Sequence, residues 1–523
     1  MTGFRVTYAT LSADDERLHA ACDGAVDAAR RAFAEHGPFP LHVGTEDRAG
    51  ATTFTTVSPV DCDVVVGEFA VGTADDVADA VGAAEAAFPA WSGTDWRERC
   101  AARDRAADAI SDASVTLAAE MGWEVGKSRL EALGDVEESA DLIRYYTHAM
   151  RQHDGFEQPM ERLAPAEATF DVMRPYGVWG VISPFNYPMA LVAGPMGAAL
   201  TAGNTVVLKP SEVGSWCAHR VYDALVGAGV PPGAVNLVTG PGETAGAALV
   251  ADRRLGGLTF TGSSEVGMAI HSSFSAEYPR PAICEMGGKN PVVVAASADL
   301  GLAVEGVARS AFGLGGQKCS AASRAFVDAS IVEEFCARLA NRAAAIPAVG
   351  PLARGGFLSP LVDDDAVARY EAAVAEAGAT GEVVCGGARM TDGELGRGNF
   401  VAPTVVRVPA DSPLWTTELF APLIAVAAVD SLDEAIDRAN ATPYGLTAGL
   451  FAAEQEEIDT FLRHIEAGVV YVNRAAGATT GAWPGVQPFG GWKRSGTGGK
   501  AGGGPYYLQQ YLREQSRTIV SRP

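Results

Sequence analysis

One cysteine, Cys319, lies in the stretch GGQKCSAASR, surrounded by glycines, a lysine and small residues. A nucleophilic cysteine must ionise and be reachable by its substrate. N–H groups must also meet the oxyanion that forms when sulfur attacks a carbonyl carbon. The glycines permit a tight turn, and we expect a helix after Cys319 to point its first N–H groups at the sulfur. Taken alone, the stretch would fit a buried structural cysteine better.

Three other segments carry side chains that suit the same chemistry. Glu285, in EMGGKNP, follows a strand-like run, where partial burial would raise its pKa toward that of a general base. Asn186 lies between two prolines in SPFNYP, a stiff loop that presents an amide donor for an oxyanion. Lys209 and Glu212, in LKPSE, place a cation and a carboxylate just past a strand, where they suit the hydroxyls of a ribose.

Two glycine-containing turns suit a phosphate group. FTGSSEVG places Gly262 and Ser263 at a strand-to-helix turn, and TGPGETAG, which contains Gly242, follows the strand-like AVNLV and precedes a helix. The GxGxxG fingerprint is missing from such a position, because its nearest match, at residues 496–501, has no strand–helix unit after it. Each segment alone has a purely structural explanation, but all of them in this order favour a catalytic site.

Alternating strand and helix patterns must position these residues. Residues 74–91 repeat apolar side chains every three or four positions, as in an amphipathic helix, and residues 96–122 are also helical in pattern. Short β-branched runs, separated by alanine-rich helical patterns, predict strands at residues 177–183, 204–212, 234–240, 257–263, 290–297, 324–330, 382–388, 424–430, 447–453 and 468–473. We therefore predict an α/β fold of two lobes, with parallel sheets covered by helices, that meet near residues 285–320.

Composition excludes several classes of function. The formal charge of −24 repels nucleic acid and anionic membrane surfaces, and no apolar run is long enough for a spanning helix or a signal peptide. We therefore expect a cytoplasmic protein that binds neither nucleic acid nor membranes.

The eight cysteines form no CxxC pair and no metal-ligand cluster with histidines, so we expect free thiols and no metal. The acidic surface also suggests adaptation to high salt, where counterions screen the repulsion.

The motifs together resemble the aldehyde dehydrogenase family along nearly the whole chain, from AFPAWS near residue 88 through PFN, KPSE, FTGSSEVG, EMGGKNP, GQKCS and ELFAP to PFGGWKRSG. The resemblance implies that Cys319 is the nucleophile and Glu285 the general base, and that Asn186 and the Cys319 N–H hold the oxyanion. It implies NAD as cofactor, preferred over NADP because the Glu212 carboxylate disfavours a 2′-phosphate. The residues expected to bind NAD are Ile182, Ser183, Pro184, Lys209, Ser211, Glu212, Gly242, Gly262, Ser263, Glu418 and Phe420.

The same resemblance implies an architecture of three parts. We expect a Rossmann-type NAD-binding domain from residues 1–157 and 176–287, and an α/β catalytic domain from residues 288–495. Residues 158–175 and 496–523 would form a small β arm for oligomerisation, because residues 162–176 alternate like a protruding hairpin with which residues 503–520 can pair. The family builds dimers with such arms, so we expect a homo-oligomer, a dimer or higher.

The substrate is suggested by residues 471–503, which resemble the anchor loop of the 1-pyrroline-5-carboxylate dehydrogenase subgroup. That subgroup oxidises glutamate γ-semialdehyde, the opened form of pyrroline-5-carboxylate, to glutamate in proline breakdown. The expected substrate contacts are the Gly481 and Ala482 N–H groups for the carboxylate, the Ser320 hydroxyl, and the apolar walls of Phe185 and Phe489.

The anchor loop departs from the subgroup in one respect. It carries about three extra residues after Asn473, and AWPG replaces a more aliphatic segment. An aldehyde dehydrogenase for another acid-ended aldehyde, such as succinate semialdehyde, therefore remains an alternative. Two further alternatives are a cysteine hydrolase or esterase without redox chemistry and a non-catalytic scaffold, but the NAD motifs oppose the first and the intact set of Cys319, Glu285 and Asn186 opposes the second.

Overall fold

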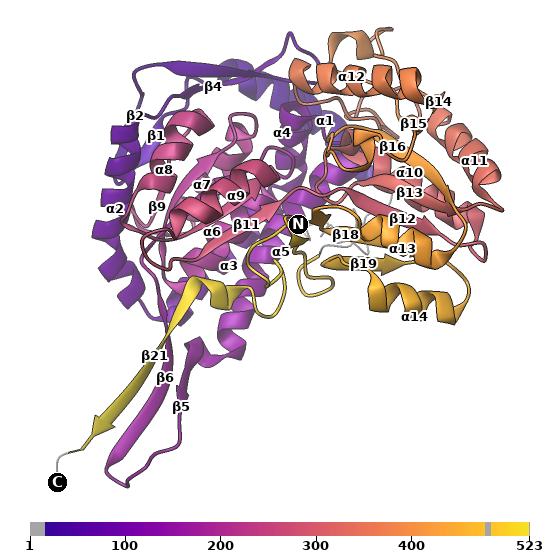
Figure 1. Ribbon diagram of the computed structural model, residues 1–523. Coiled ribbons are helices and arrows are strands. Elements are labelled where there is room, and N and C mark those ends of the chain that lie inside the picture. The colour runs from indigo at the N-terminus through magenta and orange to yellow at the C-terminus, as the bar shows by residue number, and fades with distance from the viewer. Residues whose placement is uncertain (1–15, 476–482, 522–523) are drawn as a thin grey trace.

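Two seven-stranded sheets and a projecting three-stranded arm make up the molecule (Figure 1). They are seen in a computed structural model that describes residues 16–475 and 483–521. The prediction of an α/β fold is confirmed, and each predicted strand is present. The helix predicted at residues 74–91 is also present, whereas the helical pattern of residues 96–122 is divided into two helices at Ala113.

The first sheet has the strand order β11-β10-β7-β8-β9-β1-β2. Its strands are β1 (Leu41–Val43), β2 (Glu46–Arg48), β7 (Val178–Ser183), β8 (Thr205–Pro210), β9 (Val235–Leu237), β10 (Leu255–Gly262) and β11 (Ala282–Met286). The five strands from β7 to β11 pair in parallel, and β1 and β2 extend the sheet in antiparallel fashion. The strand order reverses between β7 and β10, and ligands of such sheets bind beyond the carboxyl ends of the strands at that switch point.

Helices cover both faces of the first sheet. They are α1 (Glu16–Glu35), α2 (Ala74–Gly93), α3 (Trp96–Asp112), α4 (Ser114–Val125), α5 (Arg129–Gln152), α6 (Ala190–Ala202), α7 (Ser215–Gly227), α8 (Ala247–Ala251) and α9 (Ser264–Phe274), with a π-helical turn at Gly242–Gly246. Successive strand residues point to opposite faces. Thus Val206 and Leu208 join the core beneath α3 to α7, while Val207 joins the core beneath α2, α8 and α9.

The second sheet has the order β14-β15-β16-β13-β12-β18-β19, and only its edge strand β14 runs antiparallel to its neighbour. Its strands are β12 (Asn290–Val294), β13 (Ala322–Asp328), β14 (Glu382–Cys385), β15 (Thr404–Arg407), β16 (Leu423–Val429), β18 (Thr447–Phe451) and β19 (Val469–Val472). The helices around it are α10 (Leu300–Phe312), α11 (Val332–Ala344), α12 (Asp364–Thr380), α13 (Leu432–Asn440) and α14 (Gln455–His464). Val292 and Val294 pack beneath α10 and α11, and Val293 packs on the opposite face with α12, α13 and α14.

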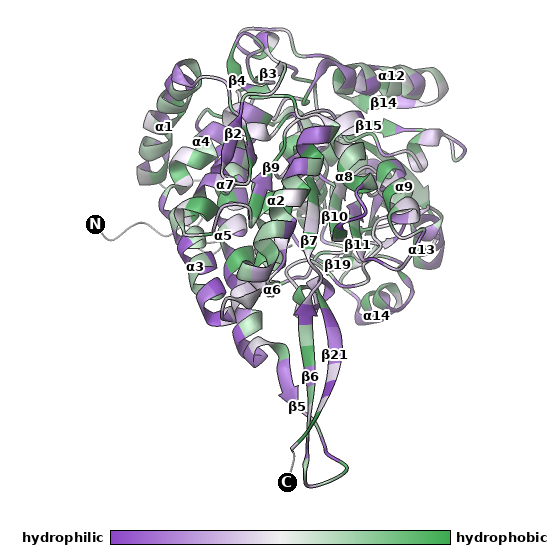
Figure 2. Cartoon of the chain, turned by 90° about the vertical axis from the view of Figure 1, so that its left-hand side faces the viewer, coloured by the Kyte–Doolittle hydropathy of each residue, from purple (hydrophilic) through white to green (hydrophobic). Residues whose placement is uncertain are grey.

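The arm consists of β5 (Glu157–Pro159), β6 (Glu167–Pro175) and β21 (Leu512–Val520), with β6 in the middle. The nine residues of β21 all pair with β6 in an antiparallel register. Figures 1 and 2 show that the arm stands clear of the body and mixes apolar and polar side chains. Two shorter pairs are β3 (Thr53–Val57) with β4 (Val65–Ala70) and β17 (Tyr444–Gly445) with β20 (Trp492–Lys493). Within the described ranges, no helix has the length and apolar character needed to cross a bilayer.

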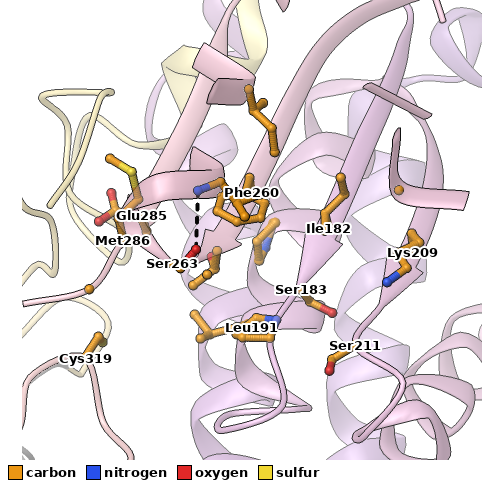
Figure 3. A pocket seen from close by; sticks show the side chains of 18 of the residues that line it. Ile182, Ser183, Leu191, Lys209, Ser211, Phe260, Ser263, Glu285, Met286 and Cys319 are labelled. Carbon is orange, nitrogen blue, oxygen red and sulfur yellow. Dashed lines mark hydrogen bonds between the residues drawn. The ribbon is translucent and has the colours of Figure 1, made fainter. Parts of the chain in front are cut away.

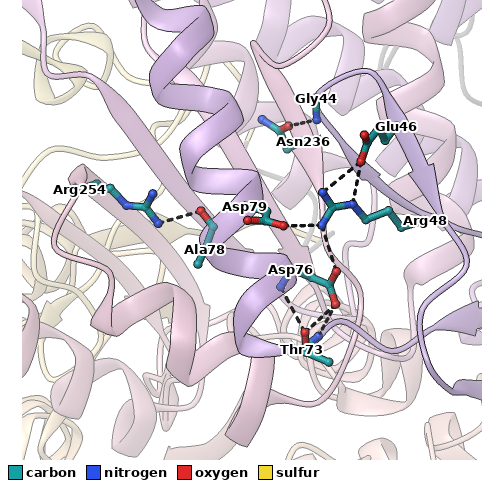
Figure 4. A network of polar contacts seen from close by, with 9 residues as sticks. All are labelled: Gly44, Glu46, Arg48, Thr73, Asp76, Ala78, Asp79, Asn236 and Arg254. Carbon is teal, nitrogen blue, oxygen red and sulfur yellow. Dashed lines mark hydrogen bonds and ion pairs between the residues drawn. The ribbon is translucent and has the colours of Figure 1, made fainter.

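A network of polar contacts fixes the start of α2 against the first sheet (Figure 4). The Thr73 hydroxyl accepts the Asp76 N–H at 3.2 Å, and the Asp76 carboxylate accepts the Thr73 N–H at 2.9 Å, which is a capping box. Arg48 of β2 donates to both Asp76 (3.3 Å) and Asp79 (2.8 Å). The helix therefore starts at a defined residue and is held to the edge strand of the sheet.

We expect Thr73→Ala to lower the free energy of unfolding by about 1 kcal/mol, because the first N–H groups of α2 would lose their cap. The midpoint of urea denaturation measures this loss. Thr380→Ala is the matched control, since the Thr380 hydroxyl donates only to Glu376 of its own helix and lies exposed. Equal midpoints for Thr73→Ala and the unsubstituted protein would contradict the capping role.

Candidate active site

A cavity of about 1330 Å³ lies at the switch point of the first sheet and reaches the segments that precede β13 and β16 of the second sheet. In Figure 3, Cys319 and Glu285 lie toward one end, and Lys209 and Ser211 lie at the other. Every predicted site residue within the described ranges lines this cavity: Ile182, Ser183, Pro184, Phe185, Asn186, Lys209, Ser211, Glu212, Gly242, Gly262, Ser263, Glu285, Cys319, Ser320, Glu418, Phe420 and Phe489. The remaining two, Gly481 and Ala482, lie outside the described residues.

Cys319 lies on a turn, and the prediction of a helix after Cys319 is wrong. The chain turns at residues 318–320 and enters β13 at Ala322, because the segment that follows pairs with both β12 and β16. The N–H groups of Cys319 and Ser320, in the turn itself, favour the thiolate and so oppose the rise in the pKa of the Cys319 thiol. The donors that the sequence suggested are therefore present, but a turn supplies them.

Two asparagine side chains hold the main chain of this turn. Asn186 Nδ2 donates to the Gln317 carbonyl at 3.0 Å, and Asn290 Nδ2 donates to the carbonyls of Cys319 (2.7 Å) and Ala321 (2.9 Å). A side-chain amide carries two N–H groups, so Asn186 retains a second donor for a ligand in the cavity. Asn186 thus contributes to the placement of the cysteine as well as offering the predicted oxyanion contact.

The residues before Cys319 fasten the turn to other elements. The Gln317 amide donates to Pro360 O at 2.9 Å, and Lys318 Nζ lies 2.5 Å from the Glu131 carboxylate of α5. Gly316 has a φ of +69°, and a Cβ there would lie 2.3 Å from Ala421 O. Only glycine fits this close approach. The turn is thereby packed against the segment that carries Glu418 and Phe420.

Burial sets the ionisation of Glu285. It lies on β11, beside the cavity, and Gly491 N donates to its carboxylate at 3.3 Å. Burial raises the pKa of Glu285 to about 8, and the Gly491 N–H opposes this rise only in part. A carboxyl group with a pKa near the working pH can exchange protons with a bound water, as a general base requires.

The pKa values of Cys319 and Glu418 are raised as well. Burial, then the Glu418 and Glu285 carboxylates, raise the pKa of the Cys319 thiol to about 12. Burial also raises the pKa of Glu418 to about 7, although Gly288 N donates to its carboxylate at 2.9 Å. A cation bound in the cavity would lower the pKa of all three groups, because it favours their charged forms.

The other end of the cavity fits a dinucleotide. Lys209 is buried and lies 3.4 Å from the Glu212 carboxylate. Both side chains line the cavity, so this end offers a cation and an anion to a ligand. Ser263 caps α9, whose N-terminus faces the cavity and suits a phosphate group. The buried hydroxyl of Ser183 has no hydrogen-bond partner among the described residues. These donors and the apolar wall at Ile182 match the chemistry of NAD, with ribose, diphosphate and base.

Aromatic side chains also line the cavity. The Phe185 and Phe420 rings meet edge to face at 5.9 Å, and Phe420 adopts a φ of +56°, which is unusual for a bulky side chain. Phe489 and the buried Ser320 also line this region. The side chains expected to form the apolar walls and to supply the hydroxyl therefore line the same cavity as Cys319.

Sequence reasoning missed one face of α5 that also lines the cavity. Glu138, Leu142 and Tyr146 recur every four residues on this helix, and Tyr507 lies against Tyr146 with the rings stacked at 5.4 Å. The four-residue spacing was the available signal. Burial, then Asp135, raise the pKa of Glu138 to about 8. The structure therefore adds a carboxyl group to the cavity.

The comparisons with known proteins agree with this geometry. The profile of the aldehyde dehydrogenase family matches residues 45–516. The chain belongs to the aldehyde dehydrogenase family. This aldehyde dehydrogenase is 34% identical over 513 residues to 1-pyrroline-5-carboxylate dehydrogenase of Geobacillus thermodenitrificans, a match that covers 95% of this chain and 97% of the relative.

Solved structures extend the similarity to the fold. A 1-pyrroline-5-carboxylate dehydrogenase from Thermus with bound NAD superposes with a TM-score of 0.91 at 33% identity, covering 100% of this chain and 99% of that one. Proline utilization A from Bdellovibrio bacteriovorus gives the same TM-score at 34% identity. This match covers 96% of this aldehyde dehydrogenase chain but only 52% of the longer proline utilization A chain.

The raised pKa of Glu285 predicts a pH dependence. Below a pH of about 8 the group is mostly protonated, so the base form accumulates as the pH rises through that value. We expect hydrolysis of the acyl-enzyme that p-nitrophenyl acetate forms on Cys319 to accelerate about tenfold between pH 7 and 9. Rapid-mixing measurements on the isolated acyl-enzyme would show this.

Glu285→Gln should hydrolyse the acyl group slowly, at a rate that does not change with pH. Glu243→Gln is the control, since Glu243 is an exposed carboxylate on the wall of the same cavity. A Glu285→Gln protein that kept the tenfold rise would show that another group is the base.

Proposed function

We propose that this aldehyde dehydrogenase oxidises glutamate γ-semialdehyde, the open form of 1-pyrroline-5-carboxylate, to glutamate with NAD as the oxidant. The observation that carries this proposal is a single cavity that joins a cysteine and a buried carboxyl group at one end to a dinucleotide-like donor set at the other. The relatives named 1-pyrroline-5-carboxylate dehydrogenase, one of them solved with NAD, support the choice of substrate and cofactor.

The first step forms a bond between sulfur and carbon. The Cys319 thiolate attacks the aldehyde carbon, and the carbonyl π electrons move to oxygen to give a thiohemiacetal oxyanion. The Cys319 N–H and the free N–H of Asn186 donate to that oxygen. Asn186 is 3% exposed, so its amide acts in a dry site where a hydrogen bond to developing charge is strong.

NAD, when bound, would supply the hydride acceptor that oxidises the thiohemiacetal on Cys319 to a thioester. The residues that would hold NAD are Ile182, Ser183, Pro184, Lys209, Ser211, Glu212, Gly242, Gly262, Ser263, Glu418 and Phe420. Glu285 then takes a proton from a water molecule, which attacks the thioester carbon. The C–S bond breaks, glutamate leaves, and the thiolate is restored.

Glu138 supports an amino acid aldehyde as the substrate. Glutamate semialdehyde carries an α-ammonium group that succinate semialdehyde lacks. The Glu138 carboxyl group lines the cavity from α5, where its raised pKa reflects burial without a cation in contact. A substrate ammonium would favour the ionised form and pair with it.

The two sheets and the arm support a division of the chain into domains and a mode of assembly. We propose that residues 1–157 and 176–287 form the NAD-binding domain and residues 288–495 the catalytic domain. Residues 158–175 and 496–523 would form the oligomerisation arm, where Met160, Leu163, Ile519 and Val520 expose apolar side chains. A second copy of the chain would cover them.

Substitutions of the two reacting residues should separate the steps. We expect Cys319→Ala to abolish NAD reduction with pyrroline-5-carboxylate. Glu285→Gln should reduce one equivalent of NAD per site and then stall as the thioester, with a steady-state rate lower by a factor of about 10² to 10⁴. Stopped-flow absorbance and intact mass would detect both results. An undiminished steady-state rate in either variant would overturn the assignment of that residue.

The two candidate substrates can be compared directly with the help of Glu138. We expect kcat/KM for pyrroline-5-carboxylate to exceed that for succinate semialdehyde, and Glu138→Gln to lower only the former, by about tenfold, as for one lost charged contact. Glu243→Gln, at the cofactor end, is the control. A higher kcat/KM for succinate semialdehyde in the unsubstituted protein would favour that aldehyde and reject the proposed substrate.

A further inference from the structure

Lys289 is a buried cation that the proposed reaction does not use. Its side chain is 1% exposed, and its ammonium group has no hydrogen-bond partner among the described residues. Two other buried lysines differ in this respect, since Lys127 lies 2.8 Å from Asp135 and Lys318 lies 2.5 Å from Glu131. An unpaired ammonium group away from water is costly, so the surroundings of Lys289 call for a compensating group.

The neighbouring side chain is also a cation. Arg324, 1% exposed, donates through Nε to the Lys289 carbonyl at 2.8 Å, and through Nη1 and Nη2 to the carbonyls of Arg438 (3.2 Å) and Ala439 (2.9 Å). These carbonyls satisfy its N–H groups but carry no full charge. In the described part of the chain, no carboxylate lies within 4.0 Å of either cation.

The carboxylates near Lys289 have other hydrogen-bond or ion-pair partners. Glu418 acts on Lys289 through space, but it accepts the Gly288 N–H and lines the large cavity. Glu466 is exposed and lies 2.5 Å from Lys493. Burial and the adjacent Arg324 lower the pKa of Lys289 to about 7. Loss of the Lys289 proton would not remove the cost of burying these groups. Arg324 would stay charged, and the N–H groups of a neutral Lys289 amine would still have no partner.

A small pocket lies beside these groups. Lys289 and Arg324 line it together with Asn440 and Tyr444, and its volume is about 10 Å³. Such a space holds about one water-sized sphere, so polyatomic anions such as sulfate or phosphate are too large. A single-atom anion is the charged ligand that fits both the size and the two positive charges.

We propose that Lys289 and Arg324 bind one halide ion, chloride under ordinary conditions, inside the second domain. The ion accepts the ammonium N–H groups of Lys289 and balances the charge of Arg324. The site also adjoins the nucleophile turn, because the next residue, Asn290, donates to the carbonyls of Cys319 and Ala321. Chloride should therefore stabilise the folded protein specifically, beyond the general screening of its acidic surface.

Crystals of the full chain grown in sodium bromide test the site directly. We expect an anomalous bromide peak in the space lined by Lys289 and Arg324, within hydrogen-bonding reach of the ammonium group. A water molecule there, without anomalous signal, would overturn the proposal. This measurement needs no substituted protein, so it remains decisive if variants of Lys289 fail to fold.

Thermal unfolding in solution tests whether binding is specific. In sodium chloride, compared with sodium gluconate at equal ionic strength, we expect Tm to rise by about 2 °C per tenfold increase in chloride above its Kd. Lys289→Met should lose this halide-specific rise, whereas Lys500→Met, which removes an exposed lysine, should keep it. Equal chloride effects in Lys289→Met and the unsubstituted protein would overturn the proposal. Neither measurement involves an aldehyde or NAD, so the result is independent of the proposed reaction.

Discussion

The position of Cys319 depends on hydrogen bonds from two asparagine side chains to three carbonyl groups of its turn. Asn186 comes from the loop after β7 and holds Gln317, whereas Asn290 begins β12 and holds Cys319 and Ala321. The Asn290 carbonyl oxygen in turn accepts the Thr447 N–H at 3.0 Å. One donor follows a strand of the first sheet and the other starts a strand of the second, so the sulfur is placed correctly only when both sheets are formed and in contact.

The same contact between the sheets controls acidity. Glu285, Cys319 and Glu418 all border the same cavity, and burial among protein atoms is the largest influence on the pKa of each. Neutral forms of the three groups are stabilised in this environment. A bound ligand that supplies a positive charge would favour the ionised forms of all three groups.

Buried charges also show how the fold manages desolvation. Lys127 with Asp135, and Lys318 with Glu131, place each ammonium group against a carboxylate, and the second pair joins α5 to the turn that carries Cys319. Lys289 and Arg324 have only main-chain carbonyls and a small cavity beside them. Lys127 and Lys318 therefore connect elements through ion pairs, whereas the charge of Lys289 needs a ligand.

The sequence by itself determined the α/β class, many of the strands and a set of the residues that line the cavity. Short β-branched runs are local signals, and Ser183, Gly262 and Glu285 lie at strand ends that such runs locate. Only the tertiary structure decided that a turn follows Cys319 instead of a helix, because strand pairing on both sides of β13 overrode local preference. It also decided that Glu138 faces the cavity and that Asn186 reaches Gln317, 131 positions away. Such contacts depend on the order of strands and on the packing of the two sheets, which local patterns do not encode.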